Sequence, residues 1–513
     1  MKPANKWIIA LSVILPTLLE VLDISVVNVS LDHIRGSLSA GVDEATWSIT
    51  AYLVANAVII PLTGWLSRLF GRKRYLAASV TLFTISSFLC GSAKTIGELV
   101  FFRVLQGISG GGLQPLSQAI LLEAFPPAEY GIAMAVFGVG VMLGPIVGPV
   151  LGGWITDNWS WPWIFYINIP LGILSLFLLK LFIQDPPYLK KQSIKEKIDY
   201  WGIGLVVIGI GCLQLVLDHG QREDWFSSSL ITALTIISVV SLILFVIVEF
   251  KTPEPIVNLR VFKDVSFSAG NIIQASAFSM FMASIILIPL FLQQLMGYNA
   301  LLAGLALMPG GIAMLLTMAV VGKLVEKVNP KLILGTGICI LAYSMYMMKG
   351  FNLLVDYRLV AWTRVVMGVG MGMLAVPLLS LSFASIKKEE MGNATSIFTL
   401  MRNISLSFGA ALIITLLSRR TQFHQFRFSE DLNPFDPRFQ VAVQKIMAVM
   451  KVKTGAGSSF TAHGVIYQQL MRQAALFSYI DAFYVAAIVV LCALPLVFLL
   501  KRPKEGSPVM PVH

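Results

Sequence analysis

The sequence carries little charge for its length. Of 513 residues only 13% are Asp, Glu, Lys or Arg, while 56% are hydrophobic and the mean hydropathy is +0.79; soluble proteins have roughly a quarter charged residues. Four cysteines inside apolar stretches and five scattered histidines give no disulfide framework and no metal-ligand spacing, so we expect no metal and no cofactor. No phosphate-binding GxxxxGK[ST] loop and no nucleophile elbow occur, which disfavours ATP-driven transport and an enzyme. The composition indicates an all-α integral membrane protein.

Fourteen apolar stretches are long enough to cross a bilayer, whose core of about 30 Å needs roughly 20 helical residues. The predicted spans are 7–31, 45–66, 75–94, 97–121, 131–153, 163–183, 200–217, 229–249, 267–292, 299–322, 332–349, 357–380, 391–417 and 476–500. With the N-terminus inside, the predicted cytoplasmic segments hold 21 Lys and Arg, against five in the short outer loops. By the positive-inside rule both termini are cytoplasmic. Much of the net charge of +11 is then a topology signal, and we expect no nucleic acid partner.

An internal repeat relates two parts of the chain. Arg103, Gly107 and Gly111 recur 261 residues later as Arg364, Gly368 and Gly372. Repeats facing each other across a central site are typical of secondary transporters, although arginine and spaced glycines could also recur by chance in glycine-rich helices. We therefore predict two pseudo-symmetric six-helix bundles, residues 1–184 and 263–513, with two additional helices between them in residues 185–262. The second bundle includes a long external segment, 418–475.

Two acidic residues lie well inside a predicted span. Glu20 and Asp23 share one face of the first span because they are three residues apart. Asp23 lies about 12 Å from the outer end of its helix, and Arg103 about 9 Å from the outer end of the fourth. An Asp23–Arg103 ion pair is therefore geometrically allowed.

This pair could act as a proton switch, because burial raises a carboxyl pKa and a nearby guanidinium lowers it. Glu20 would be the acid more easily kept protonated, or the one that meets a cationic substrate. The alternative is a static ion pair that holds two helices together. Arg364 has no acidic counterpart in the ninth span, so it could bond carbonyls or an anionic ligand.

Two further motifs could serve conformational change. In the fifth span Gly140, Gly144, Gly148 and Gly152 recur every four residues with Pro145 and Pro149 between them. They form a smooth face for close helix approach, which is either static packing or a surface that slides or seals as the halves rock. The basic loop GWLSRLFGRKR holds five candidate gate residues, which could equally be topology determinants: Gly64, Arg68, Gly71, Arg72 and Lys73.

These motifs together resemble the major facilitator superfamily, and within it the fourteen-span drug:proton antiporter branch of Emr-type exporters. LDISVVNVSL (22–31) is similar to the helix-one signature of that branch, GWLSRLFGRKR to the loop between helices two and three, RVLQG to the helix-four motif, and GVGVMLGPIVGPVLGG (138–153) to the antiporter motif. WSWPWIFYINIPLG (159–172) is similar to the entry of helix six. The chain departs from the pattern at Arg68, where the family usually has an acid, and Glu20 is not a fixed family residue. Of the two acids we therefore favour Asp23.

The resemblance implies proton-motive-force-driven export of hydrophobic or amphipathic compounds across a bacterial inner membrane by alternating access, as part of a tripartite system. It also implies a periplasmic adaptor and an outer-membrane channel as partners, besides membrane lipid. The external segment could dock the adaptor or fold back as a cap over the cavity. Polarity suggests seven residues that line the cavity: Asn28, Gln106, Gln114, Gln274, Phe278, Phe281 and Arg364. Two alternatives remain, an uncoupled or specific carrier of lipids, fatty acids or metabolites and a membrane scaffold or receptor without transport.

Overall fold

We analysed a computed structural model of the chain. It describes residues 5–126, 129–185, 199–253, 255–325, 327–430, 432–433, 435–454 and 459–501. The described part contains no strands, and thirteen of its helical stretches are long and apolar enough to span a membrane. The all-α membrane fold class is therefore confirmed.

We group the helices by the division that the sequence predicts. The first bundle then holds α1 (Lys6–Ser37), α2 (Val42–Ile59), α3 (Thr63–Phe70), α4 (Arg72–Gly91), α5 (Ile96–Gly110), α6 (Leu113–Ala124), α7 (Tyr130–Asn158), α8 (Trp163–Tyr166) and α9 (Asn168–Phe182). An accessory pair follows, α10 (Tyr200–His219) and α11 (Ser229–Lys251). The second bundle consists of α12 (Val265–Leu290), α13 (Ala300–Leu305), α14 (Met308–Leu324), α15 (Pro330–Met348), α16 (Tyr357–Phe383), α17 (Met391–Glu430) and α19 (Ser459–Leu491). Helix α18 (Pro437–Thr454) lies between the last two, and short helical turns occur at Ile60–Leu62 (η1), Trp225–Ser227 (η4), Leu259–Lys263 (η5), Phe291–Leu295 (η6), Lys388–Glu390 (η7) and Leu494–Leu499 (η8).

Polar caps explain where several of these helices begin. Side-chain oxygens of Asn5, Thr95, Asp264 and Asp356 each accept a backbone N–H from the first turn that follows. Such caps satisfy donors that have no partner inside the helix. Each polar residue stands at the edge of an apolar run, so the same boundary marks the end of a loop and the start of a span.

The predicted fourth span, 97–121, is not one continuous helix. It divides into α5 and α6 at Gly111 and Gly112, and both pieces are shorter than a membrane span. Pro115 has no N–H to donate to the Gly111 carbonyl, four residues earlier, and its ring would crowd that carbonyl. The Thr63 hydroxyl instead lies 3.5 Å from it. Neither piece is among the thirteen stretches that are long enough to span a membrane. The predicted number of fourteen spans counts α5 and α6 together as one span, so it stays a prediction.

The last two predicted spans are longer than expected. Helix α17 continues thirteen residues beyond residue 417, and α19 begins at Ser459 rather than near 476. Backbone hydrogen bonds inside a helix do not need a membrane around them. Helix α19 then ends at Leu491, four residues before Pro495, whose ring would clash with the Leu491 carbonyl.

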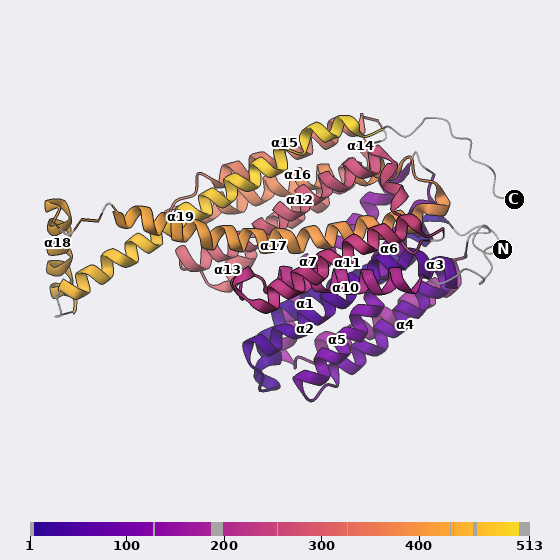
Figure 1. Ribbon diagram of the computed structural model, residues 1–513, viewed down its shortest axis with the longest axis horizontal. Coiled ribbons are helices and arrows are strands. Elements are labelled where there is room, and N and C mark those ends of the chain that lie inside the picture. The colour runs from indigo at the N-terminus through magenta and orange to yellow at the C-terminus, as the bar shows by residue number, and fades with distance from the viewer. Residues whose placement is uncertain are drawn as a thin grey trace.

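These extra turns and α18 form what we call the hairpin extension, the described part of residues 418–475. It projects from one end of the bundles (Figure 1), which we call the hairpin side. Helix α1 begins and η8 ends at the opposite end, the termini side. Helix α18 packs against α19 and stands beyond the bundles rather than across them. Of the two alternatives for this segment, a cap folded over the cavity is not what the described residues show.

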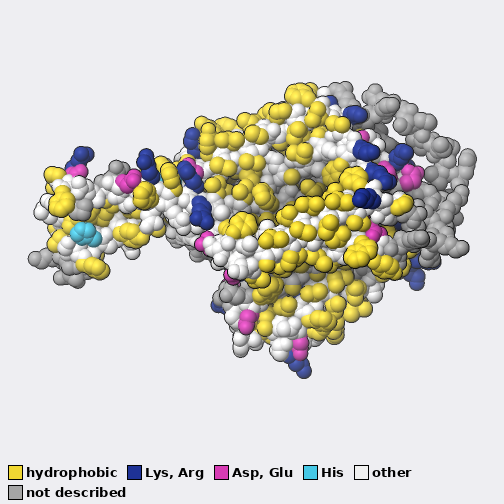
Figure 2. All heavy atoms as spheres, viewed as in Figure 1, with side chains coloured by type: hydrophobic (Ala, Val, Ile, Leu, Met, Phe, Trp, Pro, Cys, Tyr) yellow, Lys and Arg dark blue, Asp and Glu magenta, His cyan; other side chains and the backbone are white. Residues whose placement is uncertain are grey.

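The surface of the bundles fits a bilayer. Apolar side chains cover the middle of the face shown in Figure 2, and Lys and Arg side chains gather toward its ends. Helix α11 is among the most exposed spans, and its Ile236, Val239, Ile243 and Ile247 are all between 44 and 59% exposed. Because lipid tails are as apolar as these side chains, their exposure costs nothing inside a membrane.

The accessory pair occupies a seam between the two bundles. Helix α10 packs against α2 of the first bundle and α17 of the second. Gln214 Nε2 donates to Ser407 Oγ over 2.8 Å, and the Trp225 indole donates to Thr415 Oγ1 over 3.0 Å. The accessory pair is therefore bonded to the second bundle as well as packed on the first.

Candidate functional site

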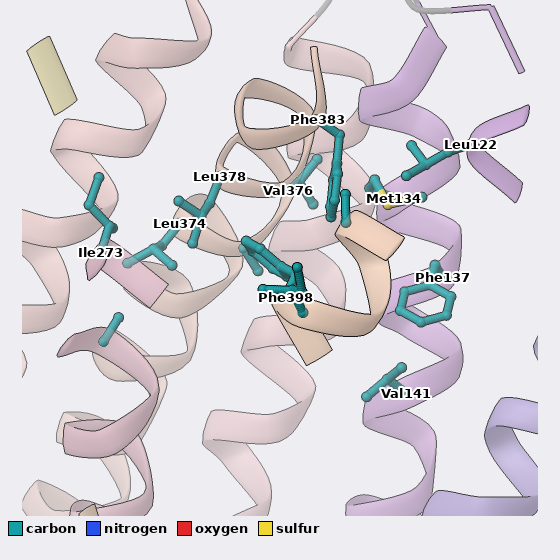
Figure 3. Close-up of a cluster of buried hydrophobic side chains, with 14 of the residues drawn as sticks. Leu122, Met134, Phe137, Val141, Ile273, Leu374, Val376, Leu378, Phe383 and Phe398 are labelled. Carbon is teal, nitrogen blue, oxygen red and sulfur yellow. The ribbon is translucent and has the colours of Figure 1, made fainter. Parts of the chain in front are cut away.

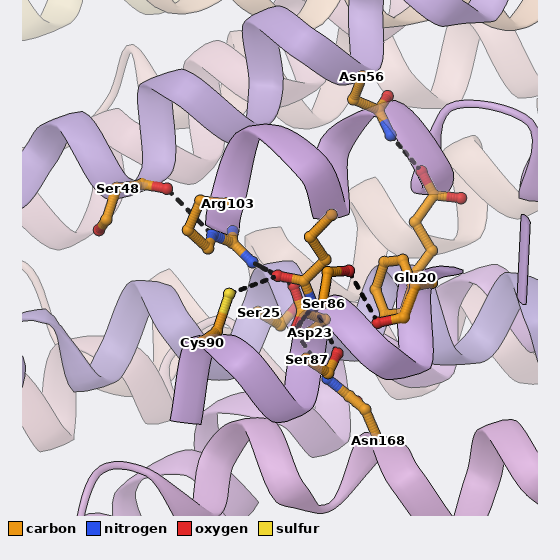
Figure 4. Close-up of polar contacts among 12 residues, drawn as sticks. Glu20, Asp23, Ser25, Ser48, Asn56, Ser86, Ser87, Cys90, Arg103 and Asn168 are labelled. Atoms are coloured by element: carbon orange, nitrogen blue, oxygen red, sulfur yellow. Dashed lines mark hydrogen bonds and ion pairs between the residues drawn. The ribbon is translucent and has the colours of Figure 1, made fainter. Parts of the chain in front are cut away.

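The candidate site is built around the buried ion pair of Asp23 and Arg103, which several hydrogen bonds surround (Figure 4). Arg103 Nη1 lies 2.6 Å from Asp23 Oδ2, and both side chains are at most 1% exposed. Asp23 belongs to α1 and Arg103 to α5. The contact predicted from their depths in the membrane is present in the structure.

Asp23 accepts further hydrogen bonds from two amide side chains. Its Oδ1 accepts hydrogen bonds from Gln106 Nε2 at 2.9 Å and from Asn168 Nδ2 at 2.7 Å. Both amides also reach the Ser87 hydroxyl of α4. Donors from α5 and α9 thus converge on one carboxylate of α1, as a buried charge requires.

Arg103, like Asp23, contacts several partners. Its Nε donates to the Ser48 carbonyl at 3.0 Å, its Nη1 also donates to Gln106 Oε1 at 2.7 Å, and its guanidinium lies 4.2 Å from the centre of the Tyr52 ring. A cation over an aromatic face is favoured by the ring's quadrupole. The pair is therefore enclosed within the first bundle.

Glu20 lies in a different environment although it is only one helical turn from Asp23. Its Oε1 accepts a hydrogen bond from Asn56 of α2 at 3.0 Å, and its Oε2 has no hydrogen-bond partner among the described residues. The side chain is 2% exposed. Figure 4 shows it pointing toward Asn56, away from Arg103. The two acids of the first span therefore do not share one cation.

A polar contact joins the two bundles near Glu20. Arg402 of α17 donates through Nη2 to Gln114 Oε1 of α6. The sequence places Arg402 inside a span, but sequence reasoning gave it no role. Gln114, which we expected in the central cavity, lies instead at this contact between the bundles and is 6% exposed.

Part of the predicted cavity lining is found in the structure. A cavity of about 30 Å³ is lined by Phe137, Gln274, Phe278, Ala375, Leu378, Leu379, Phe398 and Arg402. It lies in the apolar cluster where α6 and α7 face α12, α16 and α17 (Figure 3). Ligand pockets usually measure roughly 300–1,000 Å³, so this cavity is too small for a drug-sized molecule in the conformation described.

Three other predicted lining residues lie elsewhere. Gln106 belongs to the Asp23 network, Phe281 packs against the hydrophobic core, and Asn28 is exposed near the hairpin-side end of α1. The prediction placed them by polarity or aromaticity alone. Neither property specifies the direction in which a side chain leaves its helix.

Arg364 is buried in the second bundle without an acid. Its Nη1 lies 2.8 Å from Ser284 Oγ and 2.7 Å from Met367 Sδ, and its Nε has no partner among the described residues. Of the two alternatives for Arg364, bonds to backbone carbonyls are not found among the described residues. The sequence repeat therefore preserves the arginine but not the environment of Arg103.

The glycine stripe of α7 packs inside the first bundle. A Cβ at Gly140, Gly144, Gly148 or Gly152 would lie 2.5 to 3.0 Å from α1 atoms, of Ile14, Val21, Ser25 and Val26 respectively. Real Cβ atoms essentially never lie closer than 3.0 Å, so only glycine allows the approach at Gly140, Gly144 and Gly148, while the contact of Gly152 lies at that limit. Of the two alternatives, the structure fits packing within the first bundle, and the stripe does not lie between the two halves. Helix α7 continues through Pro145 and Pro149, both on its exposed side.

The stripe's neighbours, rather than the stripe, face the second bundle. A Cβ at Gly131 would lie 2.9 Å from Val325, and one at Gly138 would lie 2.0 Å from Met318, both of α14. Helix α7 thus contacts α1 with one face and α14 with another.

The basic loop is mostly helical and forms contacts on the termini side. Residues 64–70 lie in α3, and the turn is made by Gly71, whose φ of 84° favours glycine. A Cβ at Gly64 would lie 2.9 Å from Asn393 Cα, so the two bundles touch there.

Three of the four charged residues of this segment, Arg68, Arg72 and Lys73, have partners among the described residues. Arg68 Nη2 donates to the Pro255 carbonyl at 3.3 Å, and Arg72 pairs with Glu123. The Lys73 backbone N–H donates to Asp185 Oδ1 at 2.8 Å, and its ammonium to the Lys180 carbonyl at 2.8 Å.

Several residues of the site escaped the sequence analysis, above all Asn56, Ser87 and Asn168. Each is a polar residue inside an apolar span, which was the available signal. In the described part of the chain no group of three or more His, Cys, Asp or Glu is placed to hold a metal ion.

Comparison with known proteins gives a consistent picture. The chain matches the family model of the Major Facilitator Superfamily over residues 13–410. It is 34% identical over 500 residues to the fatty acid resistance protein FarB of Neisseria gonorrhoeae, covering 98% of this chain and 97% of that protein. It is 33% identical over 501 residues to the multidrug export protein EmrB of Escherichia coli (strain K12), covering 98% and 96%.

Solved structures agree on the fold. The proton:xylose symporter XylE superposes with a TM-score of 0.61 at 15% identity, covering 94% of this chain and 95% of that chain. The human organic anion transporter MFSD10 gives a TM-score of 0.57 at 12% identity, covering 95% and 99%. With a family match across most of the sequence and relatives of the same length, the chain belongs to the Major Facilitator Superfamily and is a multi-pass membrane transporter rather than an enzyme.

Proposed function

We propose that this protein is a proton-driven antiporter that exports hydrophobic or amphipathic compounds across a bacterial inner membrane by alternating access, with both termini in the cytoplasm. The observation that carries the proposal is the Asp23 carboxylate, which is fully buried and bonded to Arg103, Gln106 and Asn168. Membrane-embedded acids are costly and usually serve ion or proton pathways.

The proton-binding step requires a change at the ion pair. We propose that Asp23 takes up a proton when Arg103 moves away from it, because in the described conformation Arg103 Nη1 donates to Asp23 Oδ2 over 2.6 Å. Both residues belong to the first bundle, so rocking of whole bundles does not part them. We propose that α1 shifts along the glycine stripe of α7, which offers a smooth surface over four successive turns.

The driving force follows from the membrane potential. A proton moving inward gains about 2.3 kcal/mol per 100 mV, which supports roughly a fiftyfold gradient of a neutral substrate.

The two bundles touch on the termini side at Gly64 and Asn393. We interpret the described conformation as the one closed toward the cytoplasm.

The names of the relatives support the substrate class. EmrB of Escherichia coli and a second relative, EmrY, 35% identical over 498 residues, are named for multidrug export or resistance. A second candidate function is a specific fatty acid carrier, which the similarity to FarB favours. Transport measured with a collapsed proton gradient separates a coupled exporter from an uncoupled carrier.

The proposal is tested on purified protein by measuring protons released when substrate binds. Asp23→Asn should abolish release, and Asp32→Asn, an exposed acid on the same helix, should leave it unchanged. Undiminished release from Asp23→Asn would exclude this residue as the coupling group.

We further propose that the hairpin extension docks a periplasmic adaptor of a tripartite system that includes an outer-membrane channel. Its exposed aromatic side chains support this, since Phe426, Phe435 and Phe460 are 64, 85 and 88% exposed. Exposed aromatics beyond the bilayer are typical of a protein interface.

The docking proposal is tested by replacing residues 426–460, which include all three of these aromatic side chains, with a short glycine-serine linker and pulling down adaptor candidates. Binding should be lost while the membrane-embedded part still folds. If the shortened protein retains the adaptor, docking occurs elsewhere.

A further inference from the structure

A basic groove opens between α4 and α9 on the termini side, apart from the Asp23–Arg103 ion pair and bordering the basic loop at Lys73. Its volume is about 590 Å³, and it is lined by Lys73, Arg74, Ala77, Leu176, Lys180, Gln184 and Asp185. Helices α4 and α9 pack side by side in the first bundle. We call this the α4–α9 groove.

Among the described residues, the groove holds more positive than negative charge. Asp185 already caps α4 through its bond to the Lys73 N–H, and the Lys73 ammonium is bound by the Lys180 carbonyl. Among the described residues, Arg74 and Lys180 form no side-chain hydrogen bond or ion pair, and both side chains are exposed. Three cations with one acid leave the groove with a surplus of positive charge.

The position of these cations on α4 adds to the surplus. Arg72, Lys73 and Arg74 occupy its first turn, which contains no acidic residue. The N-terminal end of a helix carries partial positive charge and favours anions. Arg72 is neutralised by Glu123, but Arg74 is not, so an anion in the groove would relieve repulsion.

Apolar side chains continue from the groove along both helices toward the middle of the membrane. On α4 these are Leu82 and Ile85, 40 and 52% exposed, and on α9 they are Ile173 and Phe177, 61 and 59% exposed. A free phosphate ion would use only the cations. A molecule with a phosphate and acyl chains would use both parts of this surface.

We propose that the α4–α9 groove binds the headgroup of an anionic glycerophospholipid, whose acyl chains lie along α4 and α9. Arg74 and Lys180 contact the phosphate by charge-assisted hydrogen bonds. Basic pockets between transmembrane helices on the cytoplasmic side bind anionic headgroups elsewhere. The site depends on the membrane-spanning fold and not on the proposed role of Asp23.

The test is native mass spectrometry of the delipidated full-length protein with phosphatidylglycerol or phosphatidylethanolamine. The double variant Arg74→Gln/Lys180→Gln should lose about tenfold or more in affinity for the first phosphatidylglycerol, because each cation near a membrane surface contributes about 1 kcal/mol. Binding of phosphatidylethanolamine should not change. Lys323→Gln/Lys327→Gln, which removes two exposed cations from the termini side of the second bundle, serves as the control and should bind like the unaltered protein.

Two results would overturn the assignment. One is equal phosphatidylglycerol binding by Arg74→Gln/Lys180→Gln and by the unaltered protein. The other is displacement of the lipid by millimolar inorganic phosphate, which would identify a free-phosphate site instead. Arg74→Lys/Lys180→Arg keeps both charges and should retain binding, which separates loss of charge from misfolding.

Discussion

At Asp23 one carboxylate is satisfied by side chains from two other helices, and none of them is close to it in sequence. The donors are Arg103 and Gln106 of α5 and Asn168 of α9. A charged group inside a bundle is tolerated when a partner of opposite charge and hydrogen-bond donors or acceptors surround it. If one member of an ion pair is removed, the other charge stays buried without a partner, and its desolvation is no longer compensated. The stability of the folded protein therefore depends on both members of the Asp23–Arg103 ion pair being present.

We expect Arg103→Ala to destabilise the protein by about 3–5 kcal/mol, because Asp23 is then buried without a cation. The double variant Asp23→Asn/Arg103→Ala should regain part of this loss, since a neutral amide replaces the unpaired carboxylate. Thermal unfolding of the purified proteins in one detergent measures both. Equal melting temperatures for the single and double variants would contradict the account.

The pair of Asp23 and Arg103 was predictable, whereas its surroundings were not. Two charges at matching depth in an apolar chain have few other partners available. Asn168, by contrast, is one of several amides in apolar spans, and only the packing of α9 against α1 and α4 brings it to Asp23.

At the scale of elements, α7 shows how one helix serves two neighbours. Its stripe at Gly140, Gly144, Gly148 and Gly152 faces α1, while Gly131 and Gly138 face α14. The four-residue spacing predicted a smooth face. It could not specify which helix lies against that face, because the spacing is the same for either neighbour.

We expect Gly148→Val to lower both stability and transport, because its Cβ would lie 2.5 Å from Ser25 of α1. Overpacking of this kind costs typically about 1–3 kcal/mol. Gly153→Val is the matched control, since a Cβ there meets nothing within 4 Å. Melting temperature and substrate efflux from cells are the measurements, and a Gly148→Val protein as stable as the control would refute the tight α1–α7 contact.

The ends of α17 and α19 illustrate a limit of hydropathy. Span prediction ended where charged residues such as Arg419 and Arg420 begin, but the helix continues to Glu430. Charge marks where a helix leaves the membrane and not where it stops, because its hydrogen bonds are internal.

At the scale of the whole molecule, the two bundles meet on the termini side. Gly392 of α17 faces Ser67 of α3, with 3.4 Å between the Gly392 Cβ position and Ser67 Oγ. Alternating access requires such contacts to open and close in each cycle.

We expect Ser67→Cys/Gly392→Cys, in a background without the four native cysteines, to form a disulfide under oxidation, since this separation is compatible with disulfide geometry. The cross-link should stop transport, and reduction should restore it. Gel mobility after proteolysis between the bundles and efflux assays report the two effects. Full transport by the cross-linked protein would mean that this contact does not open during the cycle.

The sequence by itself determined that this chain is a membrane protein and at which residues nearly all of its helices occur. It also determined that Asp23 can reach Arg103. Hydropathy, span length and depth in the membrane are local properties of the chain, so they can be derived from the sequence. Only the tertiary structure decided which amides complete that site, that the glycine stripe lies against α1, that Arg402 joins Gln114 across the bundles, and that cations of α4 and α9 form one groove. These features depend on the rotation of each helix about its axis and on its neighbours, and both are set by packing between segments that are distant in sequence.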